Sequence, residues 1–163
     1  AVDLRHQARG RQGHALVGQA VAQVVAHDAH GTLEHLHRRL QNEGRVLDVL
    51  VQVKTSSEPS KYGMAPADVP AFLRRIAADF PTLRVQGLMT LAVNSPDPAE
   101  VRACFRALRE LRDRLRQDPI PGVGLDRLSM GMSGDFELAI EEGSTEVRIG
   151  TAVFGARTYP DPQ

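Results

Sequence analysis

The chain has 163 residues, of which 42% are hydrophobic and 25% are charged, so it is long enough for one globular domain with its own core. Its 20 basic and 20 acidic side chains balance, which removes the electrostatic reason to expect a nucleic acid or an acidic membrane surface as partner. A single cysteine, Cys104, excludes an internal disulfide and a cysteine-based metal cage. No run approaches the ~20 apolar residues of a membrane span, and no secretory signal opens the chain, so we expect a cytoplasmic protein.

The N-terminal part of the chain differs in composition from the rest. All six histidines lie within the first 37 residues, and the sequence opens on Ala1 rather than on methionine. The histidine spacing fits no metal-ligand template, so we predict no metal site. A truncated or misread gene start would produce such a shift, and we expect residues 1–30 to be an atypical or disordered segment. Residues 31–163 then form the domain proper, preceded by one weak strand signal at residues 21–28.

Regular elements begin near residue 33. Leucines at helical spacing predict a helix that ends at Gly44. The run "VLDVLVQV", residues 46–53, is almost continuously apolar and β-branched, which is typical of a strand covered on both faces. After the loop "KTSSEPSKYGMAP", apolar residues recur every three or four positions and predict an amphipathic helix over residues 69–80.

The same cycle of strand and helix then repeats. The run "LRVQGLMTLAV" predicts a second strand, centred on residues 84–91. The segment Asp97-Pro98-Ala99-Glu100 carries the N-cap, first-turn proline and acidic residue that begin a helix. This helix buries a leucine-rich stripe, and we interpret the arginines on its other face as a solvated surface rather than a phosphate site. These arginines are Arg106, Arg109, Arg112 and Arg116.

The last third of the chain predicts two more strands. The strand at residues 126–130 leads into Gly131-Met132-Ser133, and we expect Ser133 to cap a short helix that ends at Gly143. The final strand is predicted at residues 146–150. Alternating strands and helices are typical of parallel βα units. Because a whole (β/α)₈ barrel needs at least ~200 residues, the chain forms either an open α/β sheet or the C-terminal four or five βα units of a barrel.

Ligands of α/β folds bind at the carboxyl ends of the strands. The loops at residues 130–133 and 148–151 follow neighbouring units, and each carries a glycine and a hydroxyl side chain. Backbone N–H groups and hydroxyls from the two loops are able to hold one phosphate together. Glycine-rich strand ends are common, so this pattern alone leaves phosphate binding as one of several possibilities.

The order of residues in this region adds a family resemblance. The run "LSMGMSGDFELAIEEGSTEVRIGTAVFGAR", residues 128–157, resembles the C-terminal signature of the pyridoxal phosphate (PLP) homeostasis proteins, a PLP-binding family related to the N-terminal barrel of alanine racemase. The runs "VQVKTSSEPSKYG" and "RVQGLMTLA" resemble earlier strands of that family. The resemblance extends from about residue 33 to residue 157. It implies an α/β fold that is the C-terminal part of a (β/α)₈ TIM barrel, with PLP as cofactor.

The resemblance also implies a role for particular residues. Arg148 matches the arginine that faces the pyridine nitrogen of PLP, and it leaves that nitrogen unprotonated because arginine keeps its own proton. Gly150 and Thr151 match the positions that hold the phosphate. Ser133 and Ser129 match the serine-bearing loop on the other side of the phosphate.

Two of these assignments have structural alternatives. Met89 and Met130 would line the ring pocket, but methionine also fills irregular gaps in a core. Arg148 would instead form a buried ion pair with Glu142 or Glu146, since buried arginines are usually paired.

The sequence departs from the family in its lysines. The family's PLP-forming lysine lies in a Ser-Lys-Thr-like context on the first strand, which is not visible here. Lys54 and Lys61 are the only lysines. Lys54 stands on a different strand, where the family usually has asparagine. We therefore predict no specific covalent bond between this chain and PLP, and we interpret the chain as a C-terminal portion of its family.

The leading functional hypothesis is a PLP-binding and carrier protein with no reaction of its own, impaired by the missing lysine. Apo forms of PLP-dependent enzymes are candidate recipients, and the oligomeric state is left open. The alternative is a PLP-dependent amino-acid racemase-like enzyme, which would need a lysine on one face of the ring and an acid/base group on the other. The only tyrosines are Tyr62 and Tyr159, and neither lies in a suitable loop. A third possibility is a non-functional fragment.

Overall fold

The computed structural model describes residues 22–24, 29–58 and 61–155. The predicted N-terminal segment, residues 1–30, therefore lies largely outside the described residues, as does the end of the chain from residue 156 onward. Within the described ranges, strands and helices alternate without exception. They are β1 (Ala22–Val24), α1 (Ala29–Asn42), β2 (Leu47–Gln52), α2 (Val69–Asp79), β3 (Leu83–Met89), α3 (Pro98–Gln117), β4 (Arg127–Met132), α4 (Phe136–Glu141), β5 (Glu146–Arg148) and α5 (Thr151–Phe154).

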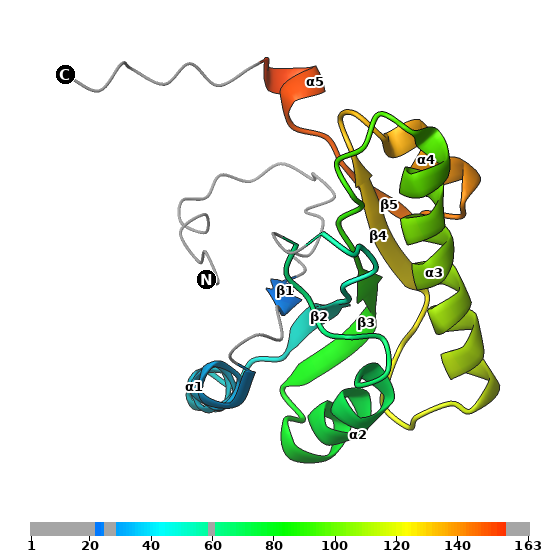
Figure 1. The fold of residues 1–163 in the computed structure, drawn as a ribbon. Helices are drawn as coiled ribbons and strands as arrows, with labels where there is room; N and C mark the ends of the chain where they lie inside the picture. Colours follow the sequence, from blue (N-terminus) through cyan, green and yellow to red (C-terminus); the bar gives the residue numbers. More distant parts are fainter. Residues whose placement is uncertain (1–21, 25–28, 59–60, 156–163) are drawn as a thin grey trace.

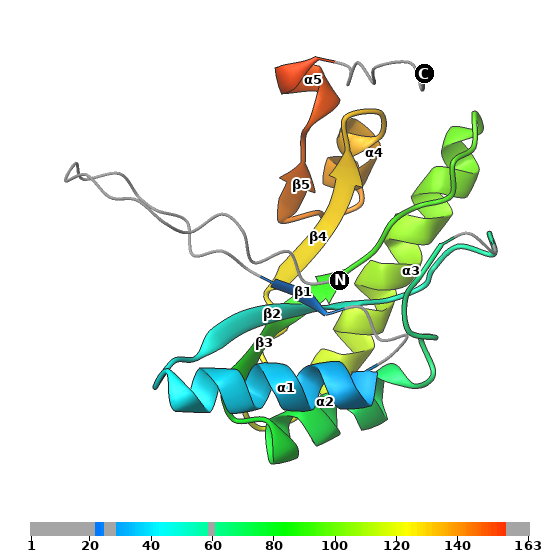
Figure 2. The same ribbon diagram turned by 90° about the vertical axis from the view of Figure 1, so that its left-hand side faces the viewer.

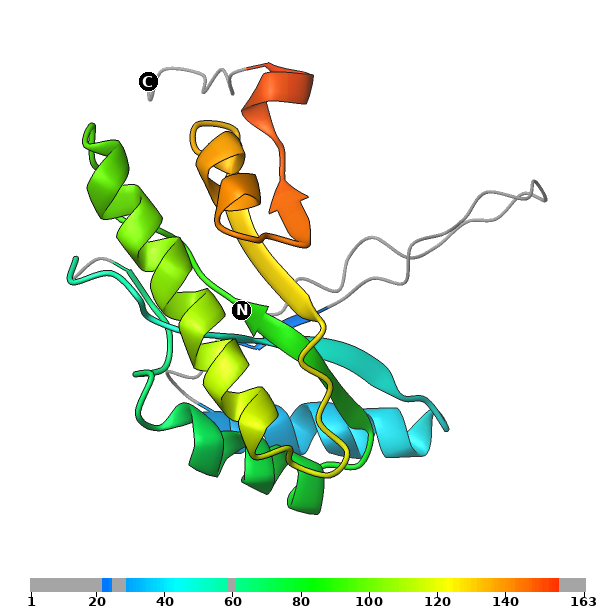
Figure 3. The same ribbon diagram turned by 90° about the vertical axis from the view of Figure 1, so that its right-hand side faces the viewer.

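The strands form one parallel sheet, and in the described part of the chain their order is β1-β2-β3-β4-β5. Helices α1 to α4 lie around one side of the sheet (Figure 1). The strand direction turns steadily from β2 to β4 (Figures 2 and 3), as expected of the twist that closes parallel strands into a barrel. The predicted α/β fold with four or five βα units is confirmed, and the weak strand signal at residues 21–28 is present as β1.

The register of the sheet separates its two faces. Val51, Leu88 and Leu128 are partners in one row, and each is 0% exposed within the core that packs on the helices. Because side chains alternate along a strand, the next row faces away from the helices. That row runs through Gln52, Met89 and Ser129. It lies toward the carboxyl ends of the strands, where the sequence predicts the ligand site.

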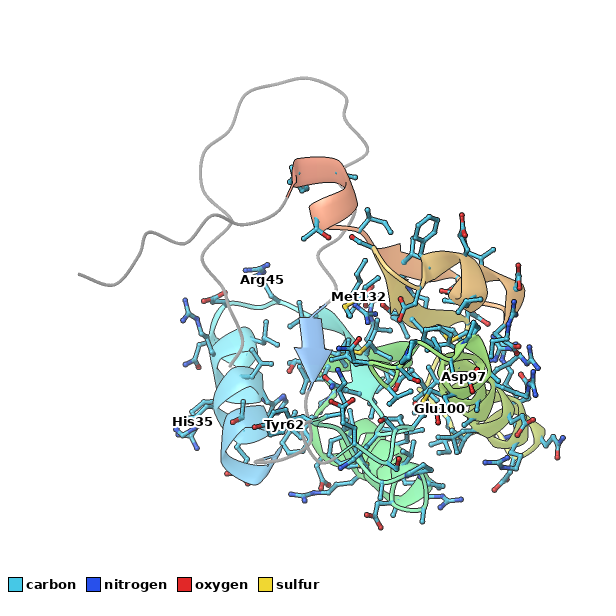
Figure 4. The ribbon with its side chains drawn as sticks, turned by 45° about the horizontal axis from the view of Figure 1, so that its top comes forward. His35, Arg45, Tyr62, Asp97, Glu100 and Met132 are labelled. Carbon is cyan, nitrogen blue, oxygen red and sulfur yellow. The ribbon has the colours of Figure 1, made fainter. Side chains whose placement is uncertain are left out.

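The starts of α3 and α4 show one correct and one wrong prediction. Asp97 is the N-cap of α3, and its side chain accepts a hydrogen bond from the Ala99 N–H at 2.9 Å. Figure 4 shows Asp97 and Glu100 close together at this helix start. The prediction that Ser133 caps the short helix is wrong, because α4 begins at Phe136 with Asp135 in the N-cap position.

Asp135 explains why the helix starts later than predicted. Its carboxylate accepts a hydrogen bond from the Met132 N–H at 2.6 Å and so closes a turn ahead of α4. An aspartate that bonds a nearby backbone N–H stabilises a turn in competition with the helix. Ser133 lies inside this turn, and its hydroxyl accepts a hydrogen bond from the Gly150 N–H.

Two glycines allow the neighbouring elements to approach closely. A Cβ added to Gly87 on β3 would lie 1.9 Å from the carbonyl oxygen of Arg127 on β4. Gly131 has φ +94, and a Cβ there would lie 2.6 Å from the Cβ of Ala139 on α4. The first glycine sets the spacing of β3 and β4, and the second lets α4 pack directly on β4. Both are part of the motifs that carry the family resemblance.

A cluster of charges holds α4 against α3. The Glu142 side chain is only 7% exposed. Its carboxylate accepts hydrogen bonds from Arg106 at 3.0 Å and from Arg109 at 3.1 Å, and its carbonyl oxygen accepts a further one from Arg109 at 2.9 Å. Arg102 lies 3.7 Å from the same carboxylate. We refer to Glu142 with these three arginines as the Glu142 clamp.

The clamp corrects the interpretation of the arginine row on α3 as a purely solvated face. That interpretation is wrong for Arg106 and Arg109, which bind a buried carboxylate from a different element. It holds for Arg116, which is exposed and pairs with the exposed carboxylate of Asp126. The Arg112 side chain is only 14% exposed and pairs with its neighbour Asp113. Arg106 and Arg109 thus have a structural partner at the C-terminal end of α4.

The close approach of β3 and β4 gives a test of the fold. We expect Gly87→Ala to lower the free energy of unfolding by about 1–3 kcal/mol, because the added Cβ must push the Arg127 carbonyl away. Gly31→Ala is the control, since nothing lies within 4 Å of a Cβ there. It should be neutral or stabilising, by about 0.5–1 kcal/mol, as alanine favours a helix. Urea unfolding measures both, and equal stability of the Gly87→Ala and parent proteins would contradict the packing.

The Glu142 clamp predicts a pH dependence. Hydrogen bonding by Arg106, followed by the charges of the three arginines, lowers the pKa of Glu142 against the opposing effect of burial. A carboxylate whose pKa is lowered on folding stabilises the fold above its unfolded pKa of about 4.3, and this contribution is lost as the pH falls through the folded value.

We therefore expect Glu142→Gln to cost about 1 kcal/mol near pH 7, discounted for the exposed ends of the arginines. The difference from the parent should narrow as the pH falls below about 4. Urea midpoints across this range measure the effect. Glu137→Gln on the exposed face of α4 is the matched control. A Glu142→Gln variant that matched the parent at pH 7 would show that the clamp does not stabilise the fold.

Candidate functional site

The arginine of the last strand reaches across the sheet. Arg148 Nη1 donates a hydrogen bond to the Ser129 hydroxyl on β4 at 2.7 Å, and Nη2 donates one to the Thr90 carbonyl after β3 at 2.9 Å. Ser129 is 2% exposed and Thr90 is 0% exposed. One guanidinium therefore links β5 to Ser129 within β4 and to the carboxyl end of β3.

Thr90 extends this network to β2. Its hydroxyl donates a hydrogen bond to the Val53 carbonyl at 2.8 Å and lies 2.8 Å from the hydroxyl of Thr55. Lys54, between these two residues, is half-buried. The carboxyl ends of β2, β3, β4 and β5 are thus connected through polar groups, at the place where ligands bind in parallel α/β folds. Thr90 was not among the predicted site residues, although it lies near the carboxyl end of the predicted second strand.

Arg148 is a partly buried cation without a salt bridge to the carboxylates that the sequence suggested. Glu146 pairs with Arg127, and Glu142 belongs to the clamp on α3. Burial lowers the pKa of Arg148, and the negative charges of Asp135 and Glu146 oppose that shift. The guanidinium still carries its charge, since arginine is not deprotonated in proteins. The site therefore presents a fixed positive charge that is held mainly by neutral acceptors.

A second pair of predicted residues meets beside this network. The Gly150 N–H donates a hydrogen bond to the Ser133 hydroxyl at 3.2 Å, which joins the loop after β4 to the end of β5. Thr151 follows as the exposed first residue of α5. The expected closeness of Ser133 and Gly150 is present. Their contact with a phosphate stays a prediction.

The space around this pair is open. A shallow hollow of about 160 Å³ lies along residues 133–138. A Cβ added to Gly150 or to Gly134 would have no heavy atom within 4 Å. In contrast to Gly87, these glycines are not needed for packing within the protein. Their lack of a side chain leaves room for a ligand to approach the backbone N–H groups.

The two methionines separate into different environments. Met130 is 0% exposed and belongs to the core that packs on the helices, so its predicted place in a ring pocket is wrong. Met89 is 1% exposed and lies in the row of Gln52 and Ser129, on the face away from the helices. Its contact with a ring stays a prediction.

Among residues 22–24, 29–58 and 61–155, no three histidine, cysteine, aspartate or glutamate side chains are placed to hold a metal ion. His6, His14 and His27 lie outside the described residues. None of the helices within those ranges combines the length and the apolar character needed to cross a membrane.

Comparison with known proteins agrees with this geometry. The family model described as alanine racemase, N-terminal domain, matches residues 4–158. The pyridoxal phosphate homeostasis protein of Aquifex aeolicus is 41% identical over 144 residues, which are 88% of this chain and 61% of that protein. The protein of the same name from Pseudomonas aeruginosa is 49% identical over 116 residues, which are 71% of this chain and 47% of that protein. The chain thus spans about half of these relatives.

Two solved structures are also similar to this chain. PipY of Synechococcus elongatus PCC7942, determined with PLP bound, is 35% identical with a TM-score of 0.71, and the match covers 83% of this chain and 60% of that one. An alanine racemase from Streptomyces lavendulae, 19% identical with a TM-score of 0.66 over 88% of this chain and 36% of that one, shares the fold. The chain therefore belongs to the family of the alanine racemase N-terminal domain, and within it to the pyridoxal phosphate homeostasis proteins.

Proposed function

We propose that this chain binds pyridoxal 5'-phosphate reversibly at the carboxyl ends of β3, β4 and β5 and acts as a carrier of that cofactor. The observation that supports this most is the position of Arg148. It lies in the same short strand end that supplies Gly150 and Thr151, and it contacts Ser129 in the strand that leads to Ser133. A fixed cation and a group of phosphate donors therefore occupy adjacent positions on two neighbouring strands.

The phosphate would be held by the Ser133 hydroxyl, the backbone N–H of Gly150 and the N–H and hydroxyl of Thr151. These groups are hydrogen-bond donors that suit a phosphate ester, and no lysine is required among them. The hollow beside Ser133 and the open space at Gly150 fit the approach of such a group. An incoming phosphate would replace the 3.2 Å bond between Ser133 and Gly150 with bonds to its own oxygens.

Arg148 would face the pyridine nitrogen. Bound PLP supplies an aldehyde and a ring that withdraws electrons most strongly when its nitrogen is protonated. Because the arginine donates its own proton and cannot accept another, it keeps that nitrogen in the unprotonated form. This weakens the ring as an electron sink, and binding with little catalysis is the expected consequence.

The lysine content favours reversible binding. Lys54 and Lys61 are the only lysine side chains in the sequence. Lys54 follows β2 and is half-buried, while Lys61 lies 3.9 Å from Glu58.

The relatives that carry the name pyridoxal phosphate homeostasis protein are longer than this chain. Delivery of PLP to apo enzymes is part of the proposal, and it rests on the relatives' name rather than on a contact surface.

One observation favours a second candidate, a racemase-like enzyme. Lys54 lies at the carboxyl end of β2, next to Thr55, whose hydroxyl contacts Thr90 in the arginine network. An amine at this place could serve as an acid/base group. Racemisation of an amino acid that required PLP and Lys54 would support this candidate over the carrier.

Three substitutions test the proposed site. Thr151→Val removes one hydroxyl and should weaken PLP binding about tenfold. Gly150→Asp should weaken it further, because it adds a side chain and a negative charge beside the phosphate. Arg148→Ala should weaken PLP binding but leave the binding of inorganic phosphate largely unchanged. Isothermal titration calorimetry with PLP and with phosphate measures each effect.

Gly122→Asp is the control for charge, and its free energy of unfolding is measured first because Gly122 has φ +82. Gly122 is exposed and lies before β4, at the opposite end of the sheet from Ser133. This variant should bind PLP as the parent does. Unchanged PLP affinity in all three site variants would exclude the proposed site.

A further inference from the structure

We infer that Ser129 and Thr90 act as a bracket that positions Arg148, and that this bracket makes the site selective for an aromatic phosphate with an unprotonated ring nitrogen. This inference rests on the proposed function and adds a positioning residue to it. It also gives Ser129 a different role from the phosphate-loop role that the family resemblance implied.

The contacts of Ser129 support this role. Its hydroxyl is 2.7 Å from Arg148 Nη1, and the residue is 2% exposed. Its register partners are Met89 on β3 and Glu146 on β5. Ser129 therefore lies within the sheet, and its hydroxyl serves the guanidinium. The loop that carries Ser133 begins only after β4 has ended.

Thr90 supplies the other half of the bracket. Its carbonyl oxygen accepts from Arg148 Nη2 at 2.9 Å, while its buried hydroxyl bonds the Val53 carbonyl. The carbonyl is fixed in place because the Thr90 N–H also donates to the Ser129 carbonyl at 3.2 Å. The two acceptors thus belong to one connected unit across β3 and β4, and together they fix both terminal nitrogens of the guanidinium.

An arginine held in this way is preorganised for ligand binding. A free arginine side chain loses up to about 2 kcal/mol of rotamer entropy when it is fixed. In this structure that loss is incurred before any ligand binds, which strengthens binding. A guanidinium has five N–H donors, and Ser129 and Thr90 receive one each. Within the described part of the chain the other donors have no protein acceptor, so they remain available to a ring nitrogen.

The test compares two ligands that share a phosphate ester. Pyridoxine phosphate carries the pyridine nitrogen but no aldehyde, so it cannot react with a lysine. Benzyl phosphate has an aromatic ring without nitrogen. The parent protein should prefer pyridoxine phosphate, and Ser129→Ala should reduce that preference about tenfold while the affinity for benzyl phosphate stays within about twofold. Ser129→Thr retains a hydroxyl and should restore most of the preference.

Ser144→Ala is the control for a general loss of sheet stability. The Ser144 hydroxyl lies within hydrogen-bond distance of the Met130 and Glu146 carbonyls and does not contact Arg148. This variant should keep the preference for pyridoxine phosphate. If Ser129→Ala kept the same preference, or if Ser144→Ala lost it equally, the bracket would not determine selectivity.

A measurement without ligand separates this inference from the proposed function. In ¹⁵N NMR spectra of the parent, we expect separate signals for the two terminal nitrogens of Arg148, assigned with Arg148→Lys, because both are hydrogen-bonded. Ser129→Ala should merge them through faster rotation, and Ser129→Thr should separate them again. Merged signals in the parent would overturn the bracket whether or not PLP binds. Separate signals in a parent that binds neither phosphate ester would overturn the proposed function and the inferred selectivity, while the bracket itself would stand.

Discussion

The hydrogen bonds of Arg148 to Ser129 on β4 and to the Thr90 carbonyl after β3 are the interaction on which the rest of the site depends. A parallel sheet brings the carboxyl ends of its strands to one edge, but it does not by itself fix the side chains there. Arg148 does this by bonding Ser129 and the Thr90 carbonyl at once. These bonds fix the position of the Arg148 cation on β5 relative to the loop after β4 that carries Ser133. Gly150 is then close enough to donate to Ser133.

The packing outside the site serves the same arrangement. Gly131 lets α4 lie directly on β4, and Glu142 ties the end of α4 to arginines of α3. The turn that contains Ser133 lies between β4 and α4, so both elements determine where its hydroxyl lies. Stability and site geometry are therefore coupled through α4. A loss of the Glu142 clamp should loosen the serine loop as well as the helix.

The sequence was informative where local chemistry decides the structure. A nearly continuous apolar run predicted β2, and the Asp97-Pro98 pair predicted the start of α3, because these signals act within a few residues. The sequence was less informative where two nearby residues could each precede a helix, or where a side chain's partner lies far away in the sequence. Asp135 rather than Ser133 precedes α4 because its carboxylate bonds the Met132 N–H. The partner of the α3 arginines, Glu142, lies more than thirty residues away from them, although arginines one and two helical turns apart were a signal for a shared acidic partner.

The most direct test of the account is a crystal structure of this chain grown with PLP. We predict the phosphate within hydrogen-bond distance of the Ser133 hydroxyl and the Gly150 N–H. We also predict the pyridine nitrogen against Arg148 and no covalent bond to a lysine. PLP bound away from the ends of β4 and β5, or attached to Lys54 with its ring turned away from Arg148, would contradict the account.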